Sequence, residues 1–362
     1  MTRARTVLLP PALAIVFAAL LCAVALLISG SSPLTALRVM VAQVGQGTTA
    51  VDIVNSGAVY YLAGLAVAIG FQMKLFNIGV EGQFRLAACV AAIVGGAIAL
   101  PPVLHTGVII LVAVVVGAAW AGIAALLKAY RGVSEVISTI MLNFIATGLI
   151  AYLIKADSFG VLQGNNISTA PIAASGAFPG IPLGGAGTLF GMVFVAALMG
   201  VGYWFMLNRT RFGFELTASG ESPTAATAGG VDAHRMVIIA LLLSGAVAGL
   251  VGLPELLGRD LAYTLTSPAG YGFTGIAVAL LGRNNPVGIA LGALLWAFLD
   301  KSALALDNFG VPREIVLIMQ GSIVLSVVIA YEVVRRYDLA AEQRRVAAEL
   351  RAGAGASTEA VR

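Results

Sequence analysis

Long apolar segments separated by short polar ones constrain the fold of this chain more than any other feature. About ten such segments recur along the sequence, and most are near the length needed to cross roughly 30 Å of hydrocarbon. They cover residues 7–28, 57–73, 83–100, 105–127, 134–154, 187–207, 236–256, 271–282, 286–304 and 314–334. The sequence therefore predicts an all-α membrane protein of about ten transmembrane helices.

We expect one transmembrane domain over residues 1–337 and a partly disordered cytoplasmic tail over 338–362, because the apolar content is lost along that tail. The eighth apolar segment is short, so it should be broken, tilted or re-entrant beside Gly270 and Gly272. The first segment is too long for the 7–15-residue core of a signal peptide and is expected to span.

The composition supports membrane insertion and excludes other classes. Hydrophobic residues make up 59% of the chain and charged residues 10%, whereas soluble domains carry about 25% charged residues. The net charge of +4 does not indicate nucleic-acid binding, because the basic residues lie in loops and the tail, where orientation signals belong. Cys22 and Cys89 both fall within apolar segments, so neither a disulfide nor a metal site is expected.

The positions of Lys and Arg predict the orientation. With the N-terminus inside, sixteen of the 21 basic residues are cytoplasmic: Arg3, Arg5, Lys74, Arg85, Lys128, Arg131, Arg209, Arg211, Arg235, Arg283 and the tail arginines Arg335, Arg336, Arg344, Arg345, Arg351 and Arg362. The outer side keeps Arg38, Lys155, Arg259, Lys301 and Arg313. An even number of spans then places both termini in the cytoplasm.

Two polar intervals are longer than a connection between helices requires. Residues 157–185, rich in Gly, Pro, Ser and Asn, are expected to form an outer loop that caps the entrance. Residues 208–235 form a cytoplasmic loop, in which Ser222 followed by Pro223 predicts the start of a short helix that ends at Gly229 and Gly230. Such a helix could be held by a partner protein, or the loop could be a solvated connector.

The apolar segments hold no ionisable residue at mid-span, because the candidates fall near segment ends: Glu81, Glu135, Glu255, Arg313, Glu314 and Glu332. A proton relay within the membrane is therefore not expected. No HExxH motif or Walker A loop occurs, and His105 and His234 lack a carboxylate or cysteine partner. The chain should be non-enzymatic and bind no metal or cofactor, so any nucleotide that drives it must be bound by another chain.

Two stretches are more polar than their surroundings. In FNIGVEGQ, the residues Asn77, Gly79, Glu81, Gly82 and Gln83 indicate a tight turn at the cytoplasmic boundary or an unwound helix junction.

The second stretch is EVISTIMLNFI, where Glu135, Thr139, Asn143 and Thr147 recur every four residues and share one side of a helix, with some drift. They could bond a neighbouring helix or line a pathway. Asn143, with Phe144 beside it, is the best candidate to face a polar substrate.

Five stretches together are similar to the permease subunits of bacterial ABC importers of the simple-sugar and nucleoside branch. They are FNIGVEGQF, EVISTIMLNFI, TRFG with the downstream AATAGG, LSGAVAGLVG and GIAVALLGRNNPVGIALGALL. They occur from about the second span to the last, and EVISTIMLN most resembles the nucleoside permeases. The resemblance implies a type II, vitamin-B12-importer-like architecture in the bacterial plasma membrane, and an importer of nucleosides driven by ATP hydrolysis in a partner.

The partners that the resemblance implies are a tandem ATP-binding subunit, which would hold the ATP and Mg, a second permease subunit and an extracytoplasmic substrate-binding lipoprotein. It also implies that the ATPase-coupling segment comprises Thr210, Phe212, Gly213, Gly220, Ala225, Ala226 and Gly230, and we expect Glu221 to contribute to its polar rim. The segment departs from the family's pattern at Thr217, where Arg is frequent, at Glu221, where Asn is frequent, and at Val231, where Ile is usual. A ribose-like sugar permease is one alternative, and a self-sufficient secondary transporter is another.

Overall fold

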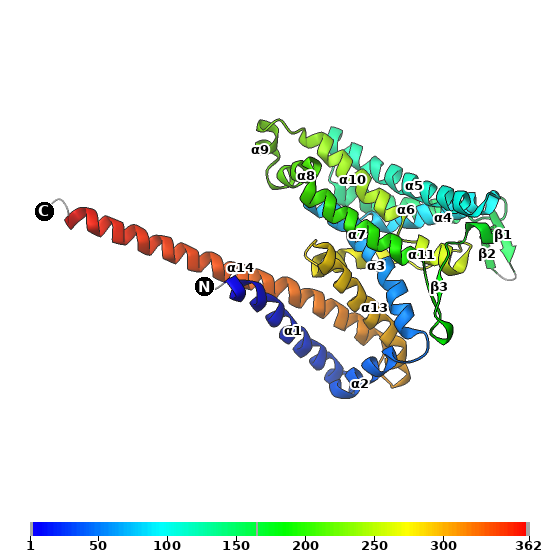
Figure 1. Cartoon of the computed structure of the whole chain (residues 1–362), viewed down its shortest axis with the longest axis horizontal. Coiled ribbons are helices and arrows are strands. Elements are labelled where there is room, and N and C mark those ends of the chain that lie inside the picture. Colours follow the sequence, from blue (N-terminus) through cyan, green and yellow to red (C-terminus); the bar gives the residue numbers. More distant parts are fainter. Residues whose placement is uncertain (1–2, 164–165, 360–362) are drawn as a thin grey trace. The chain divides into compact units, whose positions relative to one another are not determined.

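The structure, a computed structural model, describes residues 3–163 and 166–359. It divides into two compact units, one of residues 1–39 and 303–362, the other, here the main unit, of residues 40–302. Figure 1 gives the element labels used below.

The first unit is a pair of long helices. α1 (Arg3–Ile28) packs along α14 (Arg313–Glu359), with the Cys22 thiol 3.9 Å from the carbonyl oxygen of Met319. α14 continues as a helix through most of the expected tail, whose residues 360–362, with Arg362, lie outside the described part. Partial disorder of the tail remains a prediction.

The main unit holds most of the helices. Apart from α8 and α9, described below, its helices are α2 Pro33–Val44, α3 Thr49–Gln72, α4 Val80–Ala97, α5 Pro102–Arg131, α6 Glu135–Leu153, α7 Met192–Arg209, α10 Ala233–Gly249, α11 Leu253–Glu255, α12 Tyr271–Leu281 and α13 Pro286–Asn308. α2 starts in the first unit, and α13 ends in it. Each predicted apolar segment overlaps a helix, and α2 was not predicted. Within the described residues, nine helices are long and apolar enough to span a membrane, and α2 and α12 are shorter apolar helices. The all-α, multi-span class is thus confirmed, while the exact number of spans and the type II architecture remain predictions.

Small residues bring α5 and α10 together. A Cβ atom at Gly117 would collide with the backbone of Gly245 and Gly249, so the two helices approach as closely as their backbones allow. Because lipid tails are as apolar as side chains, such close van der Waals packing is what drives helix association in a membrane. This contact explains the small residues of the LSGAVAGLVG stretch.

The outer interval is more ordered than the predicted loop. β1 (Gly160–Gln163) pairs antiparallel with β2 (Asn166–Thr169), and β3 (Ile181–Pro182) pairs with β4 (Thr188–Leu189). Alternation signals are too weak in strands of two to four residues to be read from sequence. These hairpins lie at the opposite end of the main unit's helices from α8 and α9 (Figure 1).

The interval of residues 208–235 is also mostly helical. α8 (Arg211–Glu221), which was not predicted, precedes α9 (Pro223–Ala228). The short helix itself is confirmed: Ser222 caps it by accepting a bond from the Ala225 amide at 3.3 Å, and Gly230 follows with a φ of 85°. Interpreting residues 208–235 as a loop was therefore wrong for α8, whose sequence RFGFELTASGE is too polar to stand out as a helix among membrane spans.

The eighth segment is a broken element, as predicted. α12 has 11 residues and spans only about 16 Å. It begins after Gly270, whose φ is 94°, and follows an irregular stretch over residues 261–270.

Candidate functional site

The predicted coupling segment begins with α8, which is fixed to the helix ends around it. The Thr210 hydroxyl caps α8 by accepting a bond from the Gly213 amide at 3.1 Å. The buried Leu216 packs in a cluster with Met73 and Leu241, and Phe212 is partly buried against that cluster. This apolar face gives α8 a defined position relative to α3 and α10.

Two predicted glycines allow α8 to approach its neighbours closely. Gly213 lies against the backbone of α7 at Met206, and Gly220 lies against the backbone of Gln72 and Met73 at the end of α3. A side chain at either position would force these backbones apart. These two contacts therefore fix α8 against the ends of α3 and α7.

α9 presents nearly all of its surface to solvent. Of its residues, all of which are described, only Ala226 is buried, at 7% exposure, and Ala225 is exposed. The two alanines thus have different positions: Ala226 anchors α9 to the protein, and Ala225 lies on the face that is free to contact a partner. Gly230 ends the helix and returns the chain to α10.

Charged side chains surround this segment. Glu221 forms an ion pair with Lys74 at 3.0 Å, Arg211 forms one with Glu215 at 2.7 Å, and Arg209 lies over the Trp204 ring. Sequence reasoning missed Phe214, which is 71% exposed on α8. A large exposed aromatic residue beside a polar helix is a common feature of interfaces, and its position within a 3.6-residue pattern could have revealed it.

The FNIGVEGQ stretch is an unwound junction inside the helix bundle. Asn77 and Gln83 are each 1% exposed, and their side-chain amides bond each other at 3.1 Å. Asn77 also donates to the Ser244 hydroxyl at 2.8 Å, which in turn donates to the carbonyl of Ala66 at 2.6 Å. Of the two forms that the sequence predicted, the structure has the unwound helix junction, because the polar groups are buried and bonded within α3, α4 and α10. Its position at the cytoplasmic boundary remains a prediction.

The same junction binds the start of α12. The Glu81 carboxylate accepts bonds from the Gly270 amide at 2.8 Å and the Gly272 amide at 3.0 Å. Gly79 donates to the Asn77 side chain at 3.0 Å, so it too belongs to the junction. A carboxylate stabilises a helix N-terminus because the first N–H groups lack partners within the helix.

Asn143 connects α6 to this junction. Its side-chain oxygen accepts a bond from the Gly82 amide at 2.8 Å, and its nitrogen donates to the carbonyl of Ile78 at 3.0 Å. Both ends of the amide are therefore used between helices. Thr139 is fully buried and bonds within its own helix, and Phe144 is 71% exposed on another side of α6. A role of Asn143, Phe144 or Thr139 in a substrate pathway remains a prediction.

Arg85 corrects a sequence expectation. It was counted among the cytoplasmic charges, but it lies inside α4, beyond the junction, and donates from Nη1 to the Thr147 hydroxyl at 3.4 Å. Thr147 is 12 residues from the start of α6, or about 18 Å along it. The expectation that no ionisable group lies at mid-span was therefore wrong, because the unwound residues 73–79 place the start of α4 deep in the bundle.

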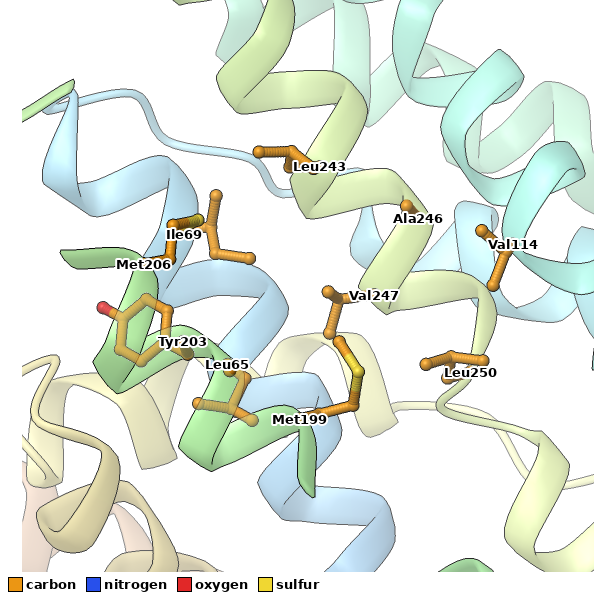
Figure 2. Close-up of a pocket in the computed structure, with 11 residues that line it drawn as sticks. Leu65, Ile69, Val114, Met199, Tyr203, Met206, Leu243, Ala246, Val247 and Leu250 are labelled. Atoms are coloured by element: carbon orange, nitrogen blue, oxygen red, sulfur yellow. The ribbon is translucent and has the colours of Figure 1, made fainter. Parts of the chain in front are cut away.

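The main unit also has an apolar cleft of about 310 Å³ between α3, α7 and α10. Figure 2 shows Leu65 and Ile69, Met199 and Met206, and Leu243 around it. The Tyr203 hydroxyl at its edge is already bonded to Gln72 and the carbonyl of Asn284. The cleft therefore lacks free hydrogen-bonding groups for a polar solute.

Comparison with known families places this geometry among transport proteins. Residues 49–328 match the family described as the permease component of branched-chain amino acid transport systems. The chain is 37% identical to a guanosine ABC transporter permease protein of Bacillus subtilis, over 76% of this chain and 79% of that one. It is 35% identical to a glucose ABC transporter permease protein of Haloferax volcanii, over 76% and 74% of the two chains.

A third relative is matched over more of its length. The chain is 31% identical to a nucleoside ABC transporter permease protein of Lactococcus lactis, over 89% of this chain and 91% of that one. No solved structure matches.

Proposed function

The chain belongs to the family of permease components of branched-chain amino acid transport systems, and from this premise we propose that it is the translocation subunit of an ATP-driven importer of nucleosides. Its relatives are permease subunits of ABC transporters, which are not themselves catalytic. ATP hydrolysis would then take place in a partner subunit, with a second permease and an extracytoplasmic binding lipoprotein completing the transporter.

One observation carries the choice of nucleosides. A nucleoside permease matches nearly the whole chain, and a guanosine permease matches it at the highest of the three identities given above. The glucose permease supports a second candidate, uptake of a simple sugar through the same mechanism. Both candidates take a neutral solute rich in hydroxyl groups, which agrees with a bundle whose polar groups are mostly uncharged.

Coupling to ATP hydrolysis would use α8 and α9. The segment lies at the end of the bundle opposite the hairpins, and we place it in the cytoplasm with both termini, as the Lys and Arg distribution predicts (Figure 1). Without Arg85, fifteen basic residues are still expected on the cytoplasmic side and five on the outer side, so the predicted orientation is unchanged. The exposed face of α9 would sit on the ATPase, and the close contacts of Gly213 and Gly220 would pass its movement to α7 and α3.

Uptake competition tests the substrate. Cells that lack the endogenous system and express the complete transporter would take up labelled guanosine, with unlabelled nucleosides, ribose and glucose as competitors. Nucleosides should compete and the sugars should not. Uptake of labelled ribose or glucose without uptake of labelled guanosine would assign the sugar branch. Gradient-driven flux through this chain alone in liposomes, without an ATPase, would assign a secondary transporter instead.

A further inference from the structure

Residues 264–270 form an irregular, largely exposed segment that runs from the hairpins, where Thr264 bridges Ser168 of β2, to Gly270 halfway along the helix bundle. Leu265 is 53% exposed, and Thr266, Pro268 and Ala269 are also exposed. The segment ends at Gly270, which is bonded to Glu81, and the adjacent Gly82 is bonded to Asn143.

The position of Asn143 gives the depth of the Gly270 end of this segment. Asn143 is eight residues from the start of α6 and ten from its end, which corresponds to about 12 Å and 15 Å along the helix. Backbone groups without secondary structure are not tolerated against lipid at such a depth, because nothing there can hydrogen-bond them. The Gly270 end of the segment must therefore face a water-filled space or another protein.

Arg85 lies close to the same place. Its Nη1 bonds Thr147, which is exposed, and its Nε is buried without a hydrogen bond. The hydroxyl of Tyr263 lies beside the guanidinium. It too lacks a hydrogen bond of normal geometry, and Tyr263 is only 4% exposed. A guanidinium has five N–H donors, so most donors of Arg85 are unused within the described part of the chain.

A charge at this depth is seldom turned towards lipid and usually marks a pathway. Asn143 and the apolar cleft are poorer candidates, because the amide of Asn143 is fully engaged and the cleft has no free polar group.

We propose that Arg85, Thr147 and residues 264–270, here called the polar face, line an aqueous pathway for the solute. Arg85 and Thr147 would hydrogen-bond the hydroxyl groups and ring acceptors of a neutral nucleoside or sugar, with the Tyr263 hydroxyl behind them. This inference rests on the proposed transport function and locates the pathway within the chain.

Cysteine accessibility tests the polar face in the complete transporter. In a background carrying Cys22→Ala and Cys89→Ala, Thr147→Cys would be labelled with a charged, membrane-impermeant methanethiosulfonate. The matched control is Leu198→Cys on α7, because Leu198 is 68% exposed and lies six residues from the end of its helix nearer the hairpins, as Thr147 does.

Thr147→Cys should react at least about tenfold faster than Leu198→Cys, because only the former faces water. Thr266→Cys should react as fast as Thr147→Cys. Labelling of Thr147→Cys no faster than the control would overturn the proposal, since the face would then lie against lipid or a dry interface.

Substitution of Arg85 gives a second readout. Arg85→Met should lower solute uptake at least about tenfold, the equivalent of one lost charge-assisted bond, and Arg85→Lys should restore part of it. Assembly with the partner subunits, followed by native gel electrophoresis, distinguishes this loss from misfolding. Uptake by an assembled Arg85→Met transporter at the wild-type rate would refute the role of Arg85.

The labelling result does not depend on which solute is carried. If the wild-type transporter fails to take up nucleosides or sugars while Thr147→Cys is labelled rapidly, the proposed function is wrong and the polar face still lines an aqueous space. If the wild type transports nucleosides while Thr147→Cys resists labelling, the proposed function holds and the polar face does not line the pathway.

Discussion

Replacing Glu81 with Gln should loosen the start of α12. The two backbone N–H bonds to the carboxylate are 2.8 and 3.0 Å long, and the residue is 6% exposed. Hydrogen bonds to a charged partner each contribute about 1.5–3 kcal/mol net, whereas a neutral bond contributes about 1 kcal/mol. Gln keeps one neutral acceptor and turns an NH₂ group toward the other amide, so Glu81→Gln should cost about 3 kcal/mol.

The control for this variant is Glu221→Gln. This variant also loses a carboxylate, but the ion pair between Glu221 and Lys74 is exposed: the Glu221 side chain is 72% accessible to solvent and the Lys74 side chain 59%. Exposed ion pairs contribute about 0–1 kcal/mol, so the control should be nearly neutral.

The assay is the apparent melting temperature of the purified transporter at one scan rate, with hydrogen exchange at the amides of residues 270–272. A loss of about 3 kcal/mol should lower the melting temperature by at least about 3 °C and speed exchange at those amides. A melting temperature within about 1 °C of the Glu221→Gln variant, with unchanged exchange, would show that the carboxylate does not hold α12.

Three further predictions follow from the contacts of the main unit. Ala225→Trp, on the exposed face of α9, should lower uptake and solute-stimulated ATP hydrolysis at least about tenfold while the chain still inserts, because a bulky side chain blocks docking of the ATPase. Asn143→Leu should cost about 2–4 kcal/mol by leaving the Gly82 amide and the Ile78 carbonyl unpaired, seen as a lower melting temperature than in wild type. Gly220→Ala should cost about 1–3 kcal/mol in the same assay, because its methyl group meets the backbone of α3.

Each of these has a control at a comparable position. Tyr130→Trp changes an exposed residue at the end of α5 and should leave uptake intact. Phe144→Leu, next to Asn143 but exposed, should barely change the melting temperature, and wild-type stability of Asn143→Leu together with lost uptake would favour a pathway role instead. Gly148→Ala has open space around it and should stabilise by about 0.5–1 kcal/mol, so an equal effect at Gly148 and Gly220 would refute the close contact.

Local signals in the sequence were sufficient for several elements. Long apolar segments predicted the spanning helices, because only a helix satisfies its own backbone in lipid. The Ser222–Pro223 start and the Gly229–Gly230 end predicted α9 with the correct bounds, because capping depends on residues that are adjacent in the chain. The short eighth segment predicted the broken helix α12.

Other elements were not predicted because their sequence signal was weak or absent. α8 has a polar composition, and the strands of the outer hairpins are too short for alternation to appear. The separate positions of Ala225 and Ala226 depend on which side of α9 faces the protein, and a six-residue helix gives no period from which to tell.

The polar residues that recur every four positions along α6, here called the polar stripe, could be recognised from the sequence, but their contacts could not. A repeat of four residues advances about 40° beyond a full turn, so the stripe rotates by about 120° from Glu135 to Thr147. Glu135 consequently meets Lys128 of α5 at 2.8 Å, Asn143 meets the junction, and Thr147 meets Arg85. The sequence contained the stripe and its drift, but not the neighbour that each residue would meet.

The sequence by itself determined that the chain spans a membrane, which way it is expected to face, and where the short helix α9 forms, because apolar length, charge and capping are properties of neighbouring residues. Only the tertiary structure decided that FNIGVEGQ runs inside the bundle, that Glu81 holds α12, and that Arg85 lies at mid-depth. Those facts depend on how far an unwound segment enters between helices that are distant in sequence, and no local pattern records that distance.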